Sequence, residues 1–307
     1  MSRHLEANSF IVNQCPGDAD TAIVSTALEY AALGTEVNLV ADDTDVLVLL
    51  MHHWKENMAD VFFHSEARKS LQTTALSWNV RDLVSKAGNL IVSHLLLVHA
   101  WSGCDTTSAT FGHGKTTLLK KLKASEVIQE ISSVLCNPNA SQEEIGQAGL
   151  RLFVILYGGK QQDSLNGLRY AKFMEMVSSS KTSIDPQKLP PTERAAYFHS
   201  LRVHLQVIIW SNLSGNDFTL DPKQWGWKLY RSVYMPITTD MNAAPESLLK
   251  FVRCRCKLSA KNPCGSNLCS CRRHGLKCVT ACGDCRGETC RNSEPIEPIL
   301  DGEETQV

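Results

Sequence analysis

The chain has 307 residues, 43% of them hydrophobic, and a formal net charge of −1 at pH 7. This length and apolar content are enough to bury a sizeable core and leave room for two or more units. A net charge near zero excludes a polycation, so any affinity for nucleic acid has to come from local basic patches. The sequence contains no run of about eighteen apolar residues, so we expect no membrane helix. The mixed polar residues after Met1 lack the apolar segment of a secretory signal, so we expect no membrane partner.

The first 135 residues alternate like an α/β domain. Apolar spacing and the stop at Gly34 predict a helix over 19–33. Short strands are expected at 37–40 and 61–64, and the uniformly apolar run 46–50 predicts a strand or segment buried on both faces. Two helices broken near Gly88-Asn89, a turn at 102–105 and a basic helix at about 115–123 complete this core.

The middle of the chain, residues 136–250, is expected to be a helical extension. Helical patterns cover 142–156 and 168–177, a polar linker follows at 178–191, and Thr192 is placed to cap a helix that runs to about Trp210. We expect the domains to be an α/β core (1–135), this extension (136–250), a cysteine-rich module (251–292) and an acidic disordered tail (293–307).

Acidic residues punctuate the core at three places. Asp18 and Asp20 open a helix, Asp43 and Asp45 follow a strand, and Asp105 lies in the later turn. Carboxylates at strand ends and helix starts of one α/β sheet gather at its carboxyl edge. Oxygen ligands gathered there suit Mg²⁺ or Mn²⁺, and two such ions can support phosphodiester cleavage. Read singly, each aspartate is more simply a helix-start or turn residue.

These segments resemble the flap endonuclease (XPG-like, PIN-like) nuclease family. The resemblance rests on CPGDADTAIVSTAL at 15–28, LVADDTDVLVLL at 39–50 and WSGCDTTSATFGHGKTTLLKKL at 101–122. It implies a parallel central sheet flanked by helices and a set of metal ligands: Asp18, Asp20, Asp43, Asp45 and Asp105. It also implies that Gly112, Gly114 and Lys115 belong to a loop that grips duplex DNA.

The segments that resemble the family do not include the beginning of the family's pattern. The family has further acidic residues upstream, and only Glu6 precedes Asp18 here. We therefore expect an N-terminally truncated core, such as an incomplete gene prediction or a decayed, transposon-derived copy would have.

The same glycines permit a rival interpretation. ATFGHGKT at 109–116 satisfies a permissive phosphate-binding loop with Ala109 in place of the first glycine. A P-loop NTPase is therefore a lesser alternative, although such a loop should directly follow a buried strand, which the sequence does not predict here.

Nine of the twelve cysteines lie in the last sixty residues, in close pairs that suit metal better than disulfides. They are Cys254, Cys256, Cys264, Cys269, Cys271, Cys278, Cys282, Cys285 and Cys290. Three tetrahedral zinc ions need twelve coordination positions, which six terminal and three bridging thiolates supply. Such a cluster carries a net charge of −3. Nine Lys and Arg residues surround it in the sequence, including Arg272, Arg273 and Lys277, against Asp284 and Glu288, which suits a phosphate backbone.

The cysteine string resembles the tesmin-type CXC (CRC) domain. The matching segments are CRC at 254–256, CSCRRHGLKC at 269–278 and CGDCRGETCRN at 282–292. The resemblance implies three clustered zinc ions and DNA binding. Cysteines kept as metal ligands fit a reducing compartment, so the nucleus is expected, with the cytosol as the alternative.

Together these patterns predict a nucleic-acid-binding protein with a zinc module and a divalent-metal, structure-specific nuclease-like core. A catalytically inactive DNA- or chromatin-associated adaptor stays open as the alternative.

Overall fold

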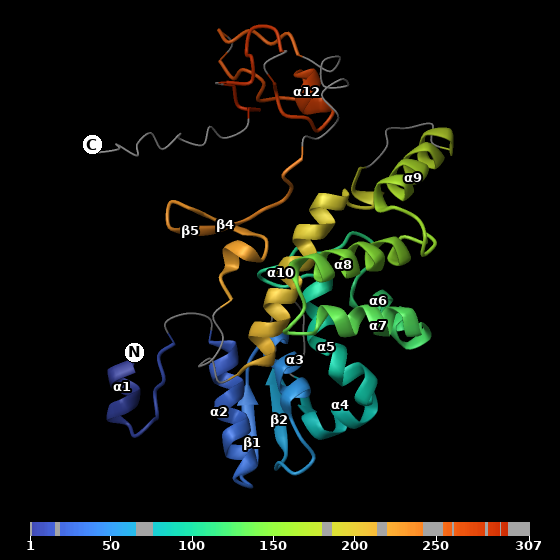
Figure 1. Cartoon of the computed structure of the whole chain (residues 1–307). Helices are drawn as coiled ribbons and strands as arrows, with labels where there is room; N and C mark the ends of the chain where they lie inside the picture. Colours follow the sequence, from blue (N-terminus) through green and yellow to red (C-terminus); the bar gives the residue numbers. More distant parts are fainter. Residues whose placement is uncertain are drawn as a thin grey trace, which may run out of the picture. The chain divides into compact units, whose positions relative to one another are not determined.

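The computed structural model describes residues 2–15, 19–65, 76–179, 186–213, 220–241, 254–259, 261–279, 282–288 and 290–293. The chain divides into two compact units, residues 1–238 and 239–307 (Figure 1). The predicted α/β core and the predicted extension up to residue 238 lie in the first unit, whereas residues 239–250 of the predicted extension and the cysteine-rich segment lie in the second. Most of the predicted tail is outside the described residues.

A small sheet organises the N-terminal part of the first unit. Strands β1 (Val37–Val40) and β2 (Val61–Ser65) pair in parallel, and β3 (Leu76–Asn79) pairs antiparallel with β2. The two strands predicted from sequence are therefore confirmed. Among the described residues, β1 and β2 are the only strands that pair in parallel, so the predicted parallel sheet is limited to these two strands.

Helices α2 (Asp20–Ala32) and α3 (Thr44–His53) pack against each other beside this sheet. Helix α2 confirms the sequence prediction. The run 46–50, expected to be a strand or a segment buried on both faces, lies in the helix α3. Its buried residues Val46, Leu49 and Leu50 follow a helical spacing, and the side chain of Asp43 caps the helix by accepting the N–H of Asp45. A short run made only of apolar residues has no alternation that distinguishes a helix from a strand. The cap provided by Asp43 favours the helix.

The broken helical pair is also confirmed. Helices α4 (Val80–Ala87) and α5 (Asn89–Ser102) meet at Gly88, whose φ of 79° allows the chain to turn sharply there. No single helix in the described part of the chain has the length and apolarity to cross a membrane. Helices α4 and α5 qualify only as a pair, which is bent by 101°.

Five further helices follow in the part of the first unit that the structure describes. They are α6 (Lys115–Ala124), α7 (Glu126–Leu135), α8 (Gln142–Leu156), α9 (Leu165–Ser179) and α10 (Glu193–Ser211). A capping box of Ser141 and Glu144 begins α8, and Thr192 caps α10 as the sequence predicts. Helix α7 was not anticipated.

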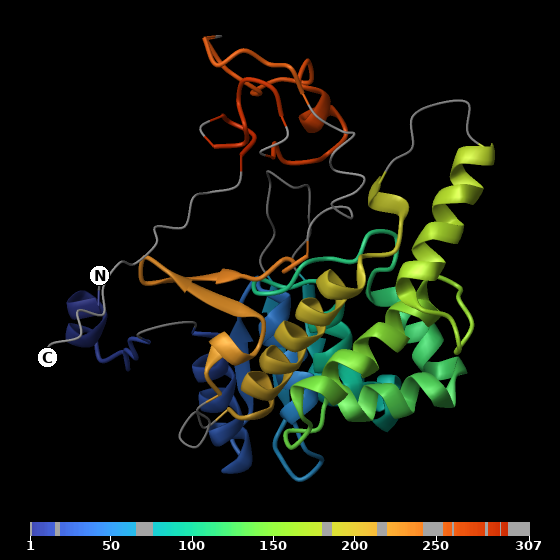
Figure 2. The same cartoon turned by 45° about the horizontal axis from the view of Figure 1, so that its top comes forward.

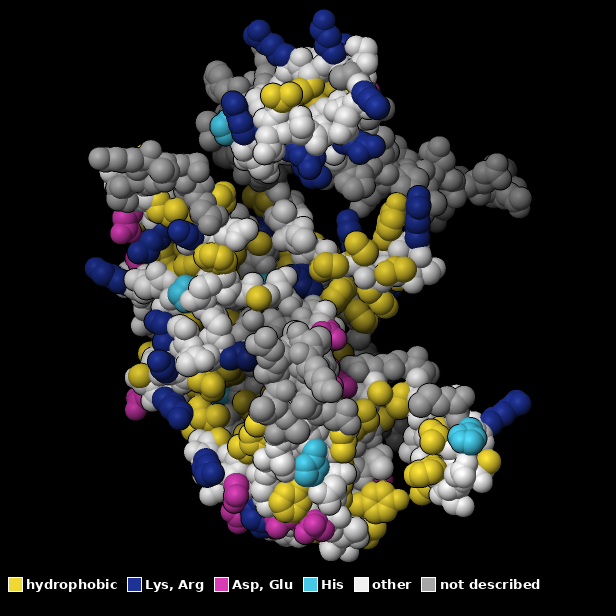
Figure 3. All heavy atoms as spheres, turned by 180° about the vertical axis from the view of Figure 1, so that it is seen from behind, with side chains coloured by type: hydrophobic (Ala, Val, Ile, Leu, Met, Phe, Trp, Pro, Cys, Tyr) yellow, Lys and Arg dark blue, Asp and Glu magenta, His cyan; other side chains and the backbone are white. Residues whose placement is uncertain are grey.

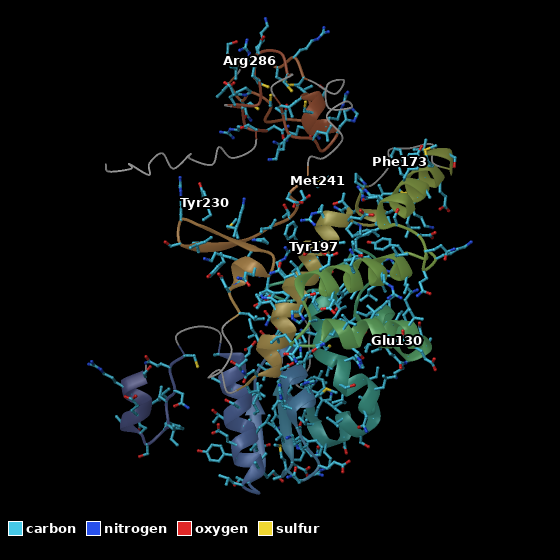
Figure 4. The ribbon with its side chains drawn as sticks, viewed as in Figure 1. Glu130, Phe173, Tyr197, Tyr230, Met241 and Arg286 are labelled. Carbon is cyan, nitrogen blue, oxygen red and sulfur yellow. The ribbon has the colours of Figure 1, made fainter. Side chains whose placement is uncertain are left out.

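Helix α10 joins the two halves of the first unit because it packs against both α5 and α8 (Figure 2). Two glycines of α8 permit the close approach. A Cβ on Gly149 would lie 1.8 Å from the Ser200 hydroxyl oxygen, and one on Gly146 would lie 2.1 Å from the ring of Tyr197, labelled in Figure 4. Core and extension therefore share one continuous hydrophobic cluster.

The remaining elements are short. They are α1 (Ser2–Ala7), the 3-10 turns η2 (Pro186–Lys188) and η3 (Pro222–Gln224), the hairpin β4 (Trp227–Tyr230)–β5 (Val233–Pro236), and α12 (Ser270–Arg273). Helix α12 lies in the second unit, where most of the described chain is turns and loops.

Candidate metal centres

Sulfur atoms form the core of the second unit. Eight of the nine predicted zinc ligands are buried and Cys256 is half-buried, and the cluster's other apolar neighbours are the partly buried Leu276 and Val279. We call residues 254–293 the cysteine module. A segment with so little apolar side chain to bury depends on its sulfurs for a fold.

The buried thiols converge in three overlapping groups of four, within each of which all sulfurs lie no more than 4.8 Å apart. The groups are Cys254-Cys271-Cys278-Cys282, Cys254-Cys264-Cys269-Cys278 and Cys264-Cys278-Cys285-Cys290. Cys278 belongs to all three, and Cys254 and Cys264 each belong to two. Four sulfurs at this separation match the tetrahedral shell of a zinc ion.

Cys256 is the predicted ligand that belongs to none of these groups. It nevertheless lies beside them, because its thiol interacts with those of Cys264 and Cys254. Burial is the main cause that raises its pKa.

Backbone geometry and one asparagine hold the sulfurs in place. Gly287 has a φ of 71°, and a Cβ there would lie 2.4 Å from the carbonyl oxygen of Cys278. The buried Asn292 donates to the Leu276 carbonyl oxygen at 2.8 Å and to the Cys278 sulfur at 3.5 Å. The N–H of Val279 donates to the Cys282 sulfur at 3.5 Å. Donors aimed at sulfur stabilise the thiolate, a role for Asn292 that sequence reasoning missed.

The thiols differ in how readily they ionise. Burial raises the pKa of Cys271 to about 12 and that of Cys285 to about 11. Burial also acts on Cys269, but the N–H of Arg272 and the adjacent thiols outweigh it and lower the pKa of Cys269 to about 7. Crowded thiols cannot all become anions unless a cation shares the site, so binding of a metal ion here would release protons.

The outer surface of the cysteine module is basic. Arg272, Arg273 and Lys277 are exposed, as is Arg286, labelled in Figure 4. Lys and Arg side chains stand out on the face of the module seen in Figure 3.

A second candidate metal centre lies in the first unit. The carboxylate oxygens of Asp20, Asp43 and Asp45 lie within 4.8 Å of one another, and we call these residues the acidic group. Asp20 begins α2, whereas Asp43 and Asp45 lie at the start of α3, just beyond the carboxyl end of β1. Of the five aspartates expected to gather at the sheet edge, the structure brings these three together.

The side chain of His99 in α5 contacts the acidic group. Its Nε2 lies 2.5 Å from Oδ1 of Asp45, and its side chain is 3% exposed. The imidazole also lies near Trp210 of α10, with ring centroids 5.6 Å apart. Sequence reasoning missed His99, because a single histidine in a buried apolar helix carries no spacing that reveals its partner 54 residues away.

Other predicted site residues lie elsewhere. Asp18 is outside the described residues. Asp105 lies in an exposed turn between the bridged Cys104 and Thr107, and its carboxylate is not part of the acidic group.

The predicted DNA-gripping loop is open to solvent. Gly112, Gly114 and Lys115 are exposed at the start of α6. The element before this loop is helix α5, whereas a P-loop requires a strand there.

Comparisons with models of protein families, with curated proteins and with solved structures find no match to this chain. The geometry of the two candidate metal centres therefore carries the functional argument.

We predict that Mg²⁺ or Mn²⁺ raises the melting temperature of the first unit, because a divalent cation relieves the repulsion within the acidic group. Metal at ten times its Kd should add about 1.4 kcal/mol of stability. Asp43→Asn should abolish the shift while keeping the helix cap, since Asn caps as well as Asp.

Asp105→Asn is the matched control, and calorimetric melting with and without metal is the measurement. A metal shift that survives in Asp43→Asn, or disappears in Asp105→Asn, would place the cation elsewhere.

Proposed function

We propose that this protein binds DNA through a three-zinc cysteine module, and that its first unit is a divalent-metal, nuclease-like core. The observation that carries the proposal is the convergence of eight buried cysteines beneath a coat of exposed Lys and Arg side chains.

The overlaps among the thiol groups support an assignment of ligands. A thiolate that bridges two zinc ions is shared by two groups, which fits Cys254 and Cys264 directly. Cys278 cannot serve all three ions, so one group needs another donor. Cys256 supplies it beside Cys254 and Cys264, in the group that also contains Cys269.

The resulting assignment satisfies every ion. One zinc would be held by Cys254, Cys271, Cys278 and Cys282, the second by Cys254, Cys256, Cys264 and Cys269, and the third by Cys264, Cys278, Cys285 and Cys290. Cys254, Cys264 and Cys278 would then each serve two ions and the other six would serve one, which supplies the twelve positions of three tetrahedral sites.

We predict three zinc ions per chain, and a larger loss on removing a bridging cysteine than on removing a terminal one. Cys278→Ser should lower the zinc content by about two ions, because Cys278 holds two. Cys256→Ser should lower it by about one. Inductively coupled plasma mass spectrometry of the full chain measures both.

Cys136→Ser is the matched control, because this cysteine lies in the first unit and burial raises its pKa to about 12, which keeps it an inert thiol. Equal zinc contents for Cys278→Ser and wild type would contradict the bridging assignment.

The charge on the cysteine module supports a nucleic-acid partner. Three zinc ions and nine thiolates leave a net charge of −3, which the surrounding cations outnumber. Exposed Arg and Lys side chains on a small metal-stapled unit are suited to phosphate contacts, each of which releases counterions. The resemblance to CXC domains implies the same partner, and a DNA partner would place the protein in the nucleus.

We predict that replacing Arg272, Arg273 and Lys277 together by Ala weakens binding to double-stranded DNA and flattens its salt dependence. Three lost phosphate contacts reduce the slope of log K against log salt by about 2.7. Fluorescence anisotropy across a salt series gives the slope.

The matched control replaces Lys55, Lys86 and Lys160, three exposed lysines of the first unit, by Ala. If both triple variants keep the wild-type slope, the cysteine module is not the DNA-binding surface.

Two features support the nuclease-like core. The acidic group gathers at the carboxyl edge of β1, where a metal site of an α/β sheet is expected, and its residues come from two of the segments that resemble flap endonucleases. Metal ions held there would activate water and stabilise the leaving oxygen of a phosphodiester.

A catalytically inactive, DNA-associated adaptor is the second candidate, and the hydrogen bonds of the acidic group favour it. Oδ1 of Asp45 is hydrogen-bonded to His99, and Oδ1 of Asp43 accepts the N–H of Asp45 as the cap of α3. Two of the oxygens needed to hold two metal ions are therefore already engaged. Cleavage of flapped DNA in Mn²⁺ that stops in Asp43→Asn distinguishes the nuclease from the adaptor.

A further inference from the structure

A cavity of about 330 Å³ lies in the first unit, and no residue of the acidic group lines it. Its walls come from the loop at 108–111 and from helices α8, α9 and α10, together with the segment before α10. Small-molecule sites in proteins begin at about this size, roughly 300 Å³.

Two arginines, Arg169 and Arg202, line the cavity. Arg202 is 5% exposed, and its Nη1 donates to the carbonyl oxygens of Gly226 at 3.2 Å and Ile237 at 2.7 Å. Arg169 is half-buried and donates to the Pro190 carbonyl oxygen. No Asp or Glu is among the described residues that line this cavity. Buried positive charge with only carbonyl partners is costly, and an anion would offset that cost.

His199 adds a buried acceptor to the same wall. Its Nε2 is buried and has no hydrogen-bond partner among the described residues, while its other ring nitrogen is held by the Trp101 backbone carbonyl. Burial and the charge of Arg202 lower the pKa of His199 to about 3, so the ring is neutral at pH 7. Nδ1–H therefore donates to Trp101, and Nε2 offers a lone pair to an incoming N–H or O–H.

Aromatic rings form the rest of the wall. Phe153 and Tyr157 of the α8 end line the cavity, and Phe111 of the adjoining loop is 49% exposed. A neighbouring hollow of about 480 Å³ shares Phe111 and Tyr157 and adds Lys172 and Lys188. Planar rings stack well on such side chains, and the added lysines extend the positive surface.

We propose that this cavity binds a nucleoside monophosphate, with the phosphate on Arg169 and Arg202 and a base N–H donated to Nε2 of His199. Three kinds of lining side chain together favour this ligand class. The arginines suit a phosphate, the His199 acceptor suits a ring N–H, and the aromatic rings suit a base. The inference goes beyond the proposed function and does not depend on zinc, DNA binding or cleavage.

Isothermal titration of the full chain with AMP, GMP, CMP and UMP tests the proposal. We expect at least one nucleotide to bind, with a Kd that rises about tenfold or more in Arg169→Gln, because a charge-assisted hydrogen bond is lost. His199→Phe keeps a ring between Trp101 and Phe153 but removes the acceptor, and should also weaken binding. Arg202 is left unchanged because it also anchors two backbone carbonyls.

Arg151→Gln is the matched control, because it removes an exposed arginine of α8 outside the cavity and should leave the Kd unchanged. The proposal is overturned if no nucleotide binds at millimolar concentration, or if Arg169→Gln and Arg151→Gln behave alike. It is also overturned if inorganic phosphate binds as tightly as every nucleotide, since the base would then contribute nothing. Arg169→Gln tests the proposal alone if His199→Phe fails to fold, which circular dichroism reports.

Discussion

Crowding of buried thiols is the constraint on which the described part of the second unit depends. Its core is sulfur, its described regular structure is the four-residue α12, and burial raises the pKa of Cys271 and Cys285. In the proposed zinc cluster, metal ions would supply the charge that lets these sulfurs ionise together, and the ligand bonds would replace the apolar burial of an ordinary domain. The nine thiolates of that cluster would outnumber the six metal charges, and the exposed Lys and Arg side chains would compensate the difference.

The first unit depends instead on helix α10. Its approach to α8, allowed by Gly146 and Gly149, and its contact with α5 make one core from two segments that look separate in the sequence. Both functional features of this unit lie along that helix. Trp210 contacts His99, which holds Asp45 of the acidic group, and His199 and Arg202 line the cavity. One buried helix thus links a candidate metal site to a candidate ligand site.

Local signals in the sequence predicted local structure well. The cap at Thr192 and the break at Gly88 gave the correct helices, because caps and glycines act over a few residues. The cysteine spacing predicted a metal cluster for the same reason, since ligands close in the chain are close in space. The run at 46–50 was harder, because a buried helix and a buried strand have the same composition.

Long-range pairings were not predictable from one sequence. The His99–Asp45 contact, and the meeting of Arg169 with His199 and Arg202 around one cavity, depend on how α5, α9 and α10 pack. No period or motif encodes these contacts. The same limit applies to the division into domains, where the boundary expected near residue 135 crosses a continuous core.

X-ray absorption at the zinc edge of the purified full chain is the most direct test of the thiolate–metal account. A cluster of three zinc ions joined by bridging cysteines should show a first shell of sulfur alone at about 2.3 Å and an added zinc–zinc scattering path. A shell with nitrogen or oxygen, or sulfur without any zinc–zinc path, would contradict the bridged cluster and the charge argument that rests on it.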